Sequence, residues 1–425
     1  MISALIVIAF VVMLLCGVPL FAVIGSVTAL CLAVGDYQQT IMAQQMFSMA
    51  DRTSLLAIPL FIVTSTLMAK GSSARRLVDF IHALVGWLPG GLSIATLTAC
   101  LIFAALAGLS PAAIIAVGTM MYPTLITGGY DERFSLGFVT SAGSLGILVP
   151  PSIVVVIFGV VGEVNIEALF IAGVTPIVLI AMMFVTYSFI VGRKNKVKRM
   201  RFRPARILRK LYSGFWAIML PVGVGGGIYS GLVTVTQAAA LGAVYAFIIE
   251  FVFYRSLKPR DLPGLMRNSG SMIGMLLIII AVTFGFNWYL TVESVPDILT
   301  EWIVAHFDSP IAFLLAVNIL LLFLGCIMDI LSAIFITVPL MLPAAVAMGI
   351  DPIHFGIVFI INFEIGYLTP PVGINLFTSG AVFKKPVIEV ARSVIPFLGL
   401  LLIALALVTY YPPISLWLVK LTGNM

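Results

Sequence analysis

The chain repeats itself at a spacing of 220 positions, and this duplication constrains its fold more than any other feature. Prolines, glycines and an aspartate of the first half recur in the second: Pro123, Gly129, Asp131, Gly146, Pro150 and Pro151 correspond to Pro343, Gly349, Asp351, Gly366, Pro370 and Pro371. Because proline restricts the backbone and glycine frees it, turns and breaks are expected at matching places. The sequence therefore predicts one structural unit built twice.

The composition is that of a membrane protein. Hydrophobic residues make up 61% of the 425 residues, charged residues 9%, and the mean hydropathy is +1.19. Apolar runs long enough to cross a bilayer core of ~30 Å recur along the chain. We expect crossings at residues 2–16, 20–34, 54–69, 134–162 and 166–191, and again at residues 213–230, 235–254, 269–290, 354–383 and 387–417.

The charges that flank the two copies have opposite signs. Residues 71–89 carry Arg75 and Arg76, whereas the matching residues 291–309 carry four acids and no lysine or arginine. After the proline pairs, acids of one copy match lysines of the other: Glu163 and Glu167 against Lys384 and Lys385. Cytoplasmic loops collect lysine and arginine, so matched loops of opposite sign predict copies that cross the membrane in opposite directions. Inverted repeats of this kind are typical of secondary transporters.

The predicted domains follow from this duplication. Residues 1–192 form the first inverted repeat and residues 211–425 the second. The connecting residues 193–210 hold ten of the 23 basic residues, which favours a cytoplasmic linker over a nucleic-acid site.

Each copy contains two interruptions in its apolar sequence. The stretches 90–127 and 310–347 are too long for one crossing, and each must return to the side it left, either as two spans or as a re-entrant hairpin; small residues at the turn favour the hairpin. The consecutive prolines, Pro150 with Pro151 and Pro370 with Pro371, stop a continuous helix, so each following crossing is discontinuous. We expect an all-α polytopic protein whose repeats each have five crossings and a hairpin, with residues 90–162 and 310–383 as the transport part.

The four breaks are the predicted functional site. Freed carbonyl groups suit a hard cation, and new helix amino termini suit an anion, which together predict cation-coupled uptake of a carboxylate. Two acids fall inside the breaks: Asp329 is the best candidate for a Na⁺ ligand, with a helix cap as the alternative, and Glu364 faces either substrate or a water-filled vestibule. Neutral oxygen donors lie beside them, each of which could instead bond to its own helix: Ser110, Ser141, Ser144, Thr369 and Asn375.

Other chemistry finds little support. The four cysteines lie singly, which indicates neither a zinc site nor a disulfide framework, and the three histidines are expected in interfacial loops. No nucleotide-binding, zinc-protease or nucleophile-elbow motif occurs, so no enzyme activity is expected.

Three sequence motifs, "GILVPPS", "AAVAMGIDPIHFGIV" and "EIGYLTPPVGINLF", resemble those of the large membrane subunit of tripartite ATP-independent periplasmic (TRAP) transporters. The resemblance runs over essentially the whole chain. It implies a bacterial inner-membrane protein that resembles elevator-type ion transporters and imports substrate with a Na⁺ gradient. It also implies two partners, a soluble periplasmic binding protein and a small four-helix membrane subunit on a separate chain. Substrates of the family are organic acids such as C4-dicarboxylates, sialic acids and related carboxylates or sulfonates.

The resemblance also implies where ions and substrate bind. A Na⁺ site would lie between each hairpin turn and its own broken helix, which groups Gly108, Ser110, Ser144, Gly146 and Pro150 in one site and Asp329, Ser332, Gly366 and Thr369 in the other. Substrate would contact Ser141, Ser152, Glu364, Gly373 and Asn375. The alternatives are a stand-alone Na⁺/dicarboxylate symporter of related architecture, and a channel or receptor.

Overall fold

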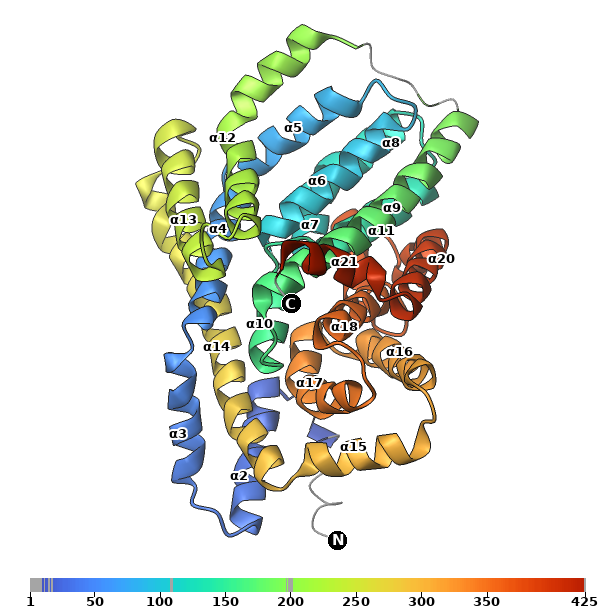
Figure 1. Cartoon of the computed structure of the whole chain (residues 1–425). Helices are drawn as coiled ribbons and strands as arrows, with labels where there is room; N and C mark the ends of the chain where they lie inside the picture. Colours follow the sequence, from blue (N-terminus) through green and yellow to red (C-terminus); the bar gives the residue numbers. More distant parts are fainter. Residues whose placement is uncertain are drawn as a thin grey trace.

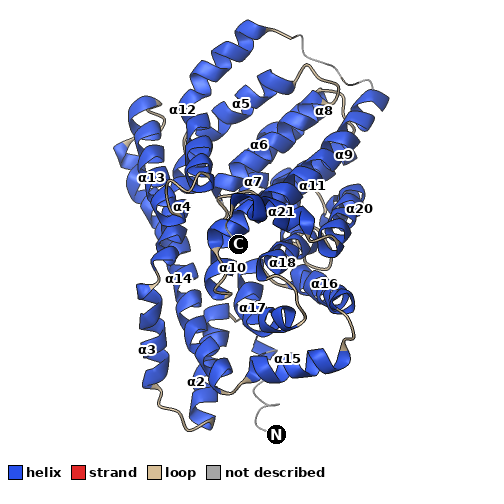
Figure 2. Ribbon diagram, viewed as in Figure 1, coloured by secondary structure: helices blue, strands red, loops and turns tan. Residues whose placement is uncertain are grey.

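The computed structural model describes residues 10, 12–13, 16, 18–107, 110–195, 197 and 202–423. Figures 1 and 2 show these residues folded as helices joined by short loops. Nine helices in the described part are long and apolar enough to cross a membrane, and one bent pair of shorter helices forms a tenth candidate. The expectation of an all-α polytopic membrane protein is confirmed.

In its described residues from Leu20 on, the first copy contains ten α-helices and four short turns of other helix types. The α-helices are α2 (Leu20–Val34), α3 (Thr40–Ser48), α4 (Ala57–Lys70), α5 (Ser73–Val85), α6 (Gly91–Ala107), α7 (Ser110–Ala113), α8 (Thr119–Thr127), α9 (Glu132–Ser144), α10 (Ile153–Val161) and α11 (Ile166–Lys194). The short turns are Met49–Asp51, Thr53–Leu56, Ile114–Gly118 and Leu145–Leu148. The predicted crossing at residues 2–16 lies mostly outside the described residues.

The second copy contains ten α-helices. They are α12 (Pro204–Tyr229), α13 (Val235–Ile248), α14 (Leu262–Val292), α15 (Val295–His306), α16 (Pro310–Ile327), α17 (Ile330–Ala347), α18 (Pro352–Gly366), α19 (Ile374–Phe383), α20 (Val387–Tyr410) and α21 (Pro413–Thr422). Short turns at Ile249–Phe253 and Pro259–Asp261 separate α13 from α14.

The broken helix of each copy starts in the same way. Gly129 and Gly349 both adopt positive φ, +100° and +76°, which a residue with a side chain rarely does. Two residues later, Asp131 and Asp351 cap α9 and α18 by accepting hydrogen bonds from backbone N–H groups of the first turn. Such caps satisfy amides that have no partner inside the helix. The repeated sequence therefore gives a repeated local structure.

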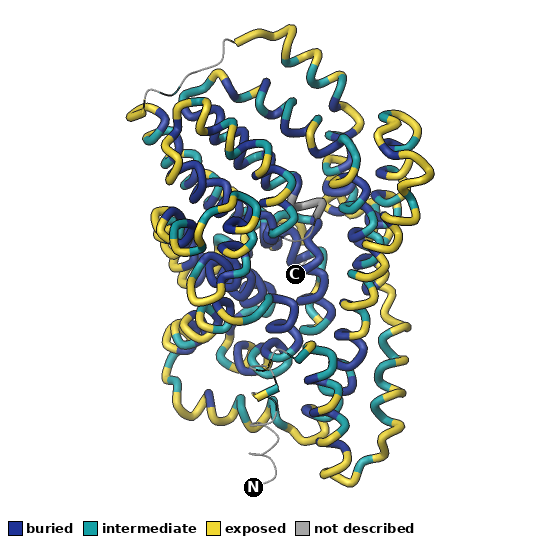
Figure 3. The backbone as a smooth tube through the Cα atoms, turned by 180° about the vertical axis from the view of Figure 1, so that it is seen from behind, coloured by how far each residue is buried: buried dark blue, intermediate teal, exposed yellow. Residues whose placement is uncertain are grey.

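Helix packing also follows the duplication. Helix α4 packs against α13, and α14 packs against α2. Since α4 corresponds to the second half of α14, and α13 to α2, exchanging the copies turns one contact into the other. These helices stand together along one side of the molecule in Figure 1, and we call them the scaffold. The hairpins and broken helices lie beside them, and the tube in Figure 3 is most deeply buried there.

Two segments expected to be loops are helices. Residues 71–89 contain α5 and residues 291–309 contain α15. Both helices carry charged residues and are too short to span a bilayer. The prediction of loops in these two segments was wrong. His82 lies in α5 and His306 in α15. Burial, followed by the nearby charge of Arg206, lowers the pKa of His82.

Three further boundaries differ from expectation. The basic linker is shorter than predicted, because helix continues to Lys194 and resumes at Pro204. The last crossing ends at Tyr410, and the prolines that follow it start the separate helix α21. The broken crossing of the second copy starts at Pro352, so His354 lies inside α18 and not in an interfacial loop.

Candidate functional site

The two proline pairs interrupt helices as predicted, but the interruptions differ in length. Between α9 and α10 a 3₁₀ turn and four residues, 149–152, bend the axis by 42°. Between α18 and α19 the seven residues 367–373 are not helical. The prolines of each pair are joined by a cis peptide bond. We call residues 145–152 the first break and residues 367–373 the second break.

A buried amide joins the first break to the opposite copy. Asn375, at the start of α19, donates from Nδ2 to Ser110 Oγ at 3.0 Å and to Ser144 Oγ at 2.8 Å. Ser110 Oγ lies 3.2 Å from Asn375 Oδ1, to which it donates. All three side chains are inaccessible to solvent. Three predicted site residues from the first hairpin and from both broken helices therefore meet at one point.

Glu364 lies against this cluster. Its carboxyl group is completely buried, and neither oxygen has a hydrogen-bond partner of good geometry among the described residues. The Ser144 hydroxyl is the side chain that interacts with it. Glu364 and Ser144 are equivalent positions at the spacing of 220, and equivalent residues meet only where the axis relating two copies passes between them. The pair thus marks the centre of the transport part.

Backbone contacts hold the second hairpin against the second break. The N–H groups of Val372 and Gly373 donate to the Cys326 carbonyl, both at 3.2 Å, and the Ile330 N–H donates to the Tyr367 hydroxyl at 2.7 Å. A Cβ added to Gly366 would lie 2.6 Å from Gly325 Cα, so the two segments touch backbone to backbone. Gly366 has no room for a side chain, and a Cβ at Gly325 would lie 3.1 Å from Gly366 Cα, which is a tight contact.

Asp329 acts as a helix cap in the second hairpin. It accepts a hydrogen bond from the Ser332 N–H at 3.0 Å and another from the Ser332 hydroxyl. The described contacts of Asp329 are therefore those of a helix cap, which was the predicted alternative to Na⁺ ligation. Both carboxylate oxygens keep further lone pairs, so a role in binding Na⁺ stays a prediction.

The hydroxyl groups near the two breaks differ in their hydrogen bonds. The hydroxyl oxygens of Ser141 and Ser152 are buried and have no hydrogen-bond partner among the described residues. In the second break the Thr369 hydroxyl donates to the Ile365 carbonyl of its own helix at 2.8 Å. Gly108 lies outside the described residues. Both predicted Na⁺ ligand sets stay predictions.

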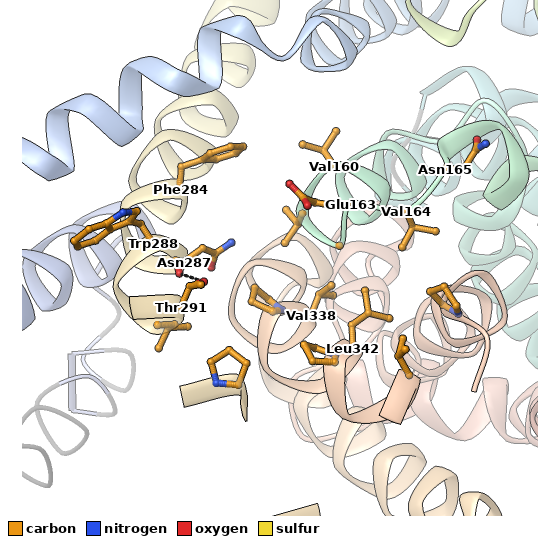
Figure 4. A pocket seen from close by; sticks show the side chains of 18 of the residues that line it. Val160, Glu163, Val164, Asn165, Phe284, Asn287, Trp288, Thr291, Val338 and Leu342 are labelled. Atoms are coloured by element: carbon orange, nitrogen blue, oxygen red, sulfur yellow. Dashed lines mark hydrogen bonds between the residues drawn. The ribbon is translucent and has the colours of Figure 1, made fainter. Parts of the chain in front are cut away.

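A large cleft lies elsewhere, between the scaffold and the transport part. It has a volume of about 1260 Å³. In Figure 4, Phe284 and Asn287 of α14 face Glu163, in the turn after α10, and Leu342 of α17 across this space. The predicted substrate residues Ser141, Ser152, Glu364, Gly373 and Asn375 do not line it. Their contact with substrate stays a prediction.

Some polar residues with structural roles were not singled out from the sequence. Asn318, Asn362, Thr409, His354 and Ser415 form a buried chain of hydrogen bonds between α16, α18, α20 and α21. The sequence pattern that could have identified them is a single polar residue inside an apolar run.

Glu250 is another such residue. It is fully buried and accepts hydrogen bonds from the N–H groups of Ser72 and Ser73, each at 3.0 Å. It thereby fixes the start of α5 to the scaffold. Like Glu364, Glu250 is a single acid inside an apolar run, residues 245–254, and this pattern could have identified it from the sequence.

Two broken helices that face two hairpins, beside a scaffold of long apolar helices, define a multi-pass membrane transport protein and not an enzyme. The comparisons with known proteins give the family. The chain matches the model of the "Tripartite ATP-independent periplasmic transporter, DctM component" over residues 7–414, and it belongs to this family. As a large permease subunit, it takes part in substrate import together with a binding protein and a small membrane subunit.

Individual relatives agree with this assignment. The chain is 41% identical over 383 residues to the C4-dicarboxylate TRAP transporter large permease protein DctM of Pseudomonas aeruginosa, covering 90% of each chain. It is 34% identical to the isethionate TRAP transporter permease protein DctMQ of Oleidesulfovibrio alaskensis, covering 96% of this chain and 65% of that one. The YdaH transporter of Alcanivorax borkumensis has a similar fold, with a TM-score of 0.64, 13% identity and 89% of each chain covered.

Proposed function

We propose that the chain imports an organic acid across the bacterial inner membrane, coupled to Na⁺, by movement of the transport part along the scaffold. One observation carries this proposal: the two breaks and the two hairpins pack together around the buried cluster of Ser110, Ser144 and Asn375, and the cleft of about 1260 Å³ separates part of this unit from α14. A unit held together internally and separated from its support by a cleft can move as a body.

The proposed role of Na⁺ is to complete the oxygen clusters at the breaks. Ser110, Ser144, Ser141 and Ser152 would supply neutral oxygens at the first break, and Asp329 would supply the charge at the second. Na⁺ would balance the charge of an anionic substrate and tie each hairpin to its broken helix. The amino termini of α10 and α19 would present N–H groups to the anion.

The proposed substrate is a carboxylate or sulfonate. The relatives support this class, since their names specify C4-dicarboxylate in one case and isethionate in another. We propose a C4-dicarboxylate as the first compound to test, because that relative shares the higher identity. The proposed partners are a soluble periplasmic binding protein and a separate small four-helix membrane subunit. The P. aeruginosa relative is named a large permease protein and matches this chain over 90% of its own length, which supports a separate small subunit.

Uptake into proteoliposomes tests the proposal. The chain is reconstituted with its small subunit, and labelled succinate is supplied on a purified binding protein, with or without an inward Na⁺ gradient. Uptake should require all three proteins and the gradient. Uptake at a comparable rate without the binding protein would favour a stand-alone symporter. Flux that is independent of Na⁺ and persists in Asp329→Asn would favour a channel.

A further inference from the structure

The two copies of the scaffold differ at one place, and the difference puts an arginine into the cleft. In the second copy, α14 runs without interruption from Leu262 to Val292. The matching stretch of the first copy is broken between α3 and α4 by two short 3₁₀ turns. Arg52 lies between these turns with extended backbone angles, φ −83° and ψ 93°, whereas its counterpart Met272 lies inside α14. Only the first copy therefore turns a residue of this stretch out of the helix.

Arg52 is the one lysine or arginine among the described residues that line the cleft. Its Nη2 donates to Glu163 Oε1 at 2.9 Å, and its guanidinium carbon lies 5.9 Å from the centre of the Phe284 ring. The side chain is half exposed, and no other donor of this guanidinium group bonds to a described residue. A guanidinium group presents five N–H donors in a fixed fork that matches a carboxylate. Most of this fork is free.

Glu163 already places a carboxylate on that fork. It occupies the turn between α10 and α11 with φ +53°, a conformation that is uncommon for residues other than glycine, and its side chain is 70% exposed. An ion pair this exposed contributes little to stability. It does connect the scaffold to the transport part directly across the cleft. The remaining acid that lines the cleft, Asp297, belongs to α15 and makes no ion pair with a described residue.

We propose that Arg52 binds a carboxylate group of the incoming organic acid and that Glu163 occupies the same place until the substrate arrives. The inference rests on the proposed transport of an organic acid and assigns a recognition residue to it. When the substrate carboxylate binds the Arg52 fork, Glu163 is released, and the ion pair across the cleft is broken. Helix α4 still packs against α6 and α10, so recognition of the anion removes one of several contacts that hold the transport part to the scaffold.

The test measures initial rates of succinate uptake in the complete reconstituted system. Arg52→Gln should raise KM about 10- to 100-fold, the loss expected for one charge-assisted hydrogen-bonded pair, with little change in kcat or in the Na⁺ dependence. Glu163→Gln should change KM in the opposite direction, because it removes the internal competitor. Arg267→Gln, which removes an exposed arginine at the far end of α14, is the matched control and should keep both constants.

Opposite changes in KM for the two variants distinguish substrate recognition from a structural role of the ion pair. If the ion pair only stabilised the fold, Arg52→Gln and Glu163→Gln would act alike, and that result overturns the proposal, as does an Arg52→Gln variant with the KM of the original protein. Thermal unfolding checks that each variant is folded. If Arg52→Gln does not fold, Arg52→Lys carries the test, since it keeps the charge but lacks the fork and should raise KM severalfold. Absence of uptake by the unsubstituted system would instead refute the proposed function.

Discussion

The two breaks come from the same sequence motif and yet meet different surroundings. In the first break, Leu145–Leu148 and Pro151 are buried, because α6, α11 and α18 pack around the turn. In the second break, Pro370, Pro371 and Val372 are exposed, and the hydrogen bonds that hold it come from the second hairpin. The two breaks are therefore unequal: the first is enclosed by neighbouring helices, and the second is open at the surface of the protein.

The side chains around the two breaks also differ in their hydrogen bonding. Around the first break the buried hydroxyl oxygens of Ser141 and Ser152 lack partners, whereas around the second break Asp329 and Thr369 already bond to their own helices. The hydroxyl groups of Ser141 and Ser152 beside the enclosed break therefore lack hydrogen-bond partners among the described residues, whereas the polar groups beside the open break already have them. Four measurements test this contrast.

The largest expected effect is on chemical accessibility. In a variant whose four cysteines are replaced, Val372→Cys should react readily with a water-soluble maleimide, and Ser152→Cys should not. If opening the first break requires ~3 kcal/mol, its labelling is slowed on the order of 100-fold. Mass spectrometry of the intact chain gives both rates. Equal rates would show that the first break opens freely, and the contrast would fail.

The next effect is on the contact between the second hairpin and the second break. Gly366→Ala should destabilise the chain by about 1 to 3 kcal/mol, because the added methyl group meets the Gly325 backbone at 2.6 Å. Thermal unfolding in detergent measures the loss. Gly399→Ala is the control, since a Cβ there meets nothing within 4 Å. A neutral Gly366→Ala would mean that the hairpin moves aside without penalty.

A similar or smaller loss of stability is expected for a substitution beside the first break. Asn375→Leu leaves the hydroxyl groups of Ser110 and Ser144 without their shared partner, which costs about 1 to 3 kcal/mol. The stabilisation of the protein by added Na⁺ should shrink at the same time. Asn318→Leu, in the separate buried chain of hydrogen bonds, should lower the unfolding temperature while keeping the full response to Na⁺. Identical Na⁺ responses in the two variants would show that the hydrogen bonds of Asn375 do not support Na⁺ binding at Ser110 and Ser144.

The smallest effect on stability is expected at Asp329. Asparagine also caps helices well, so Asp329→Asn should change the free energy of unfolding by only about 0.5 kcal/mol or less. The Na⁺ concentration needed for half-maximal uptake should nevertheless rise, since the anionic ligand is lost. Uptake at graded Na⁺ concentrations measures this. An unchanged Na⁺ dependence would leave Asp329 with the capping role alone.

Much of this architecture could be predicted without coordinates. The apolar runs, the proline pairs and the glycine and aspartate before each broken helix act over a few residues, and the structure contains the breaks where these patterns predict them. The charge pattern predicts loops at residues 71–89 and 291–309, but these segments form α5 and α15, and α5 buries Leu77, Val78 and Ile81. The caps of α9 and α18 needed only local sequence.

A duplicated membrane protein with four interruptions follows from the sequence alone, because hydrophobicity, proline and glycine act through the nearest bonds and the surrounding lipid. Which interruption is enclosed and which is open depends on how the helices pack in three dimensions. The same packing brings Asn375 to Ser110 and Ser144, places Glu364 against its counterpart Ser144, and turns Arg52 toward Glu163 across the cleft. Those contacts join residues from 111 to 265 positions apart, and such pairings depend on how whole helices pack.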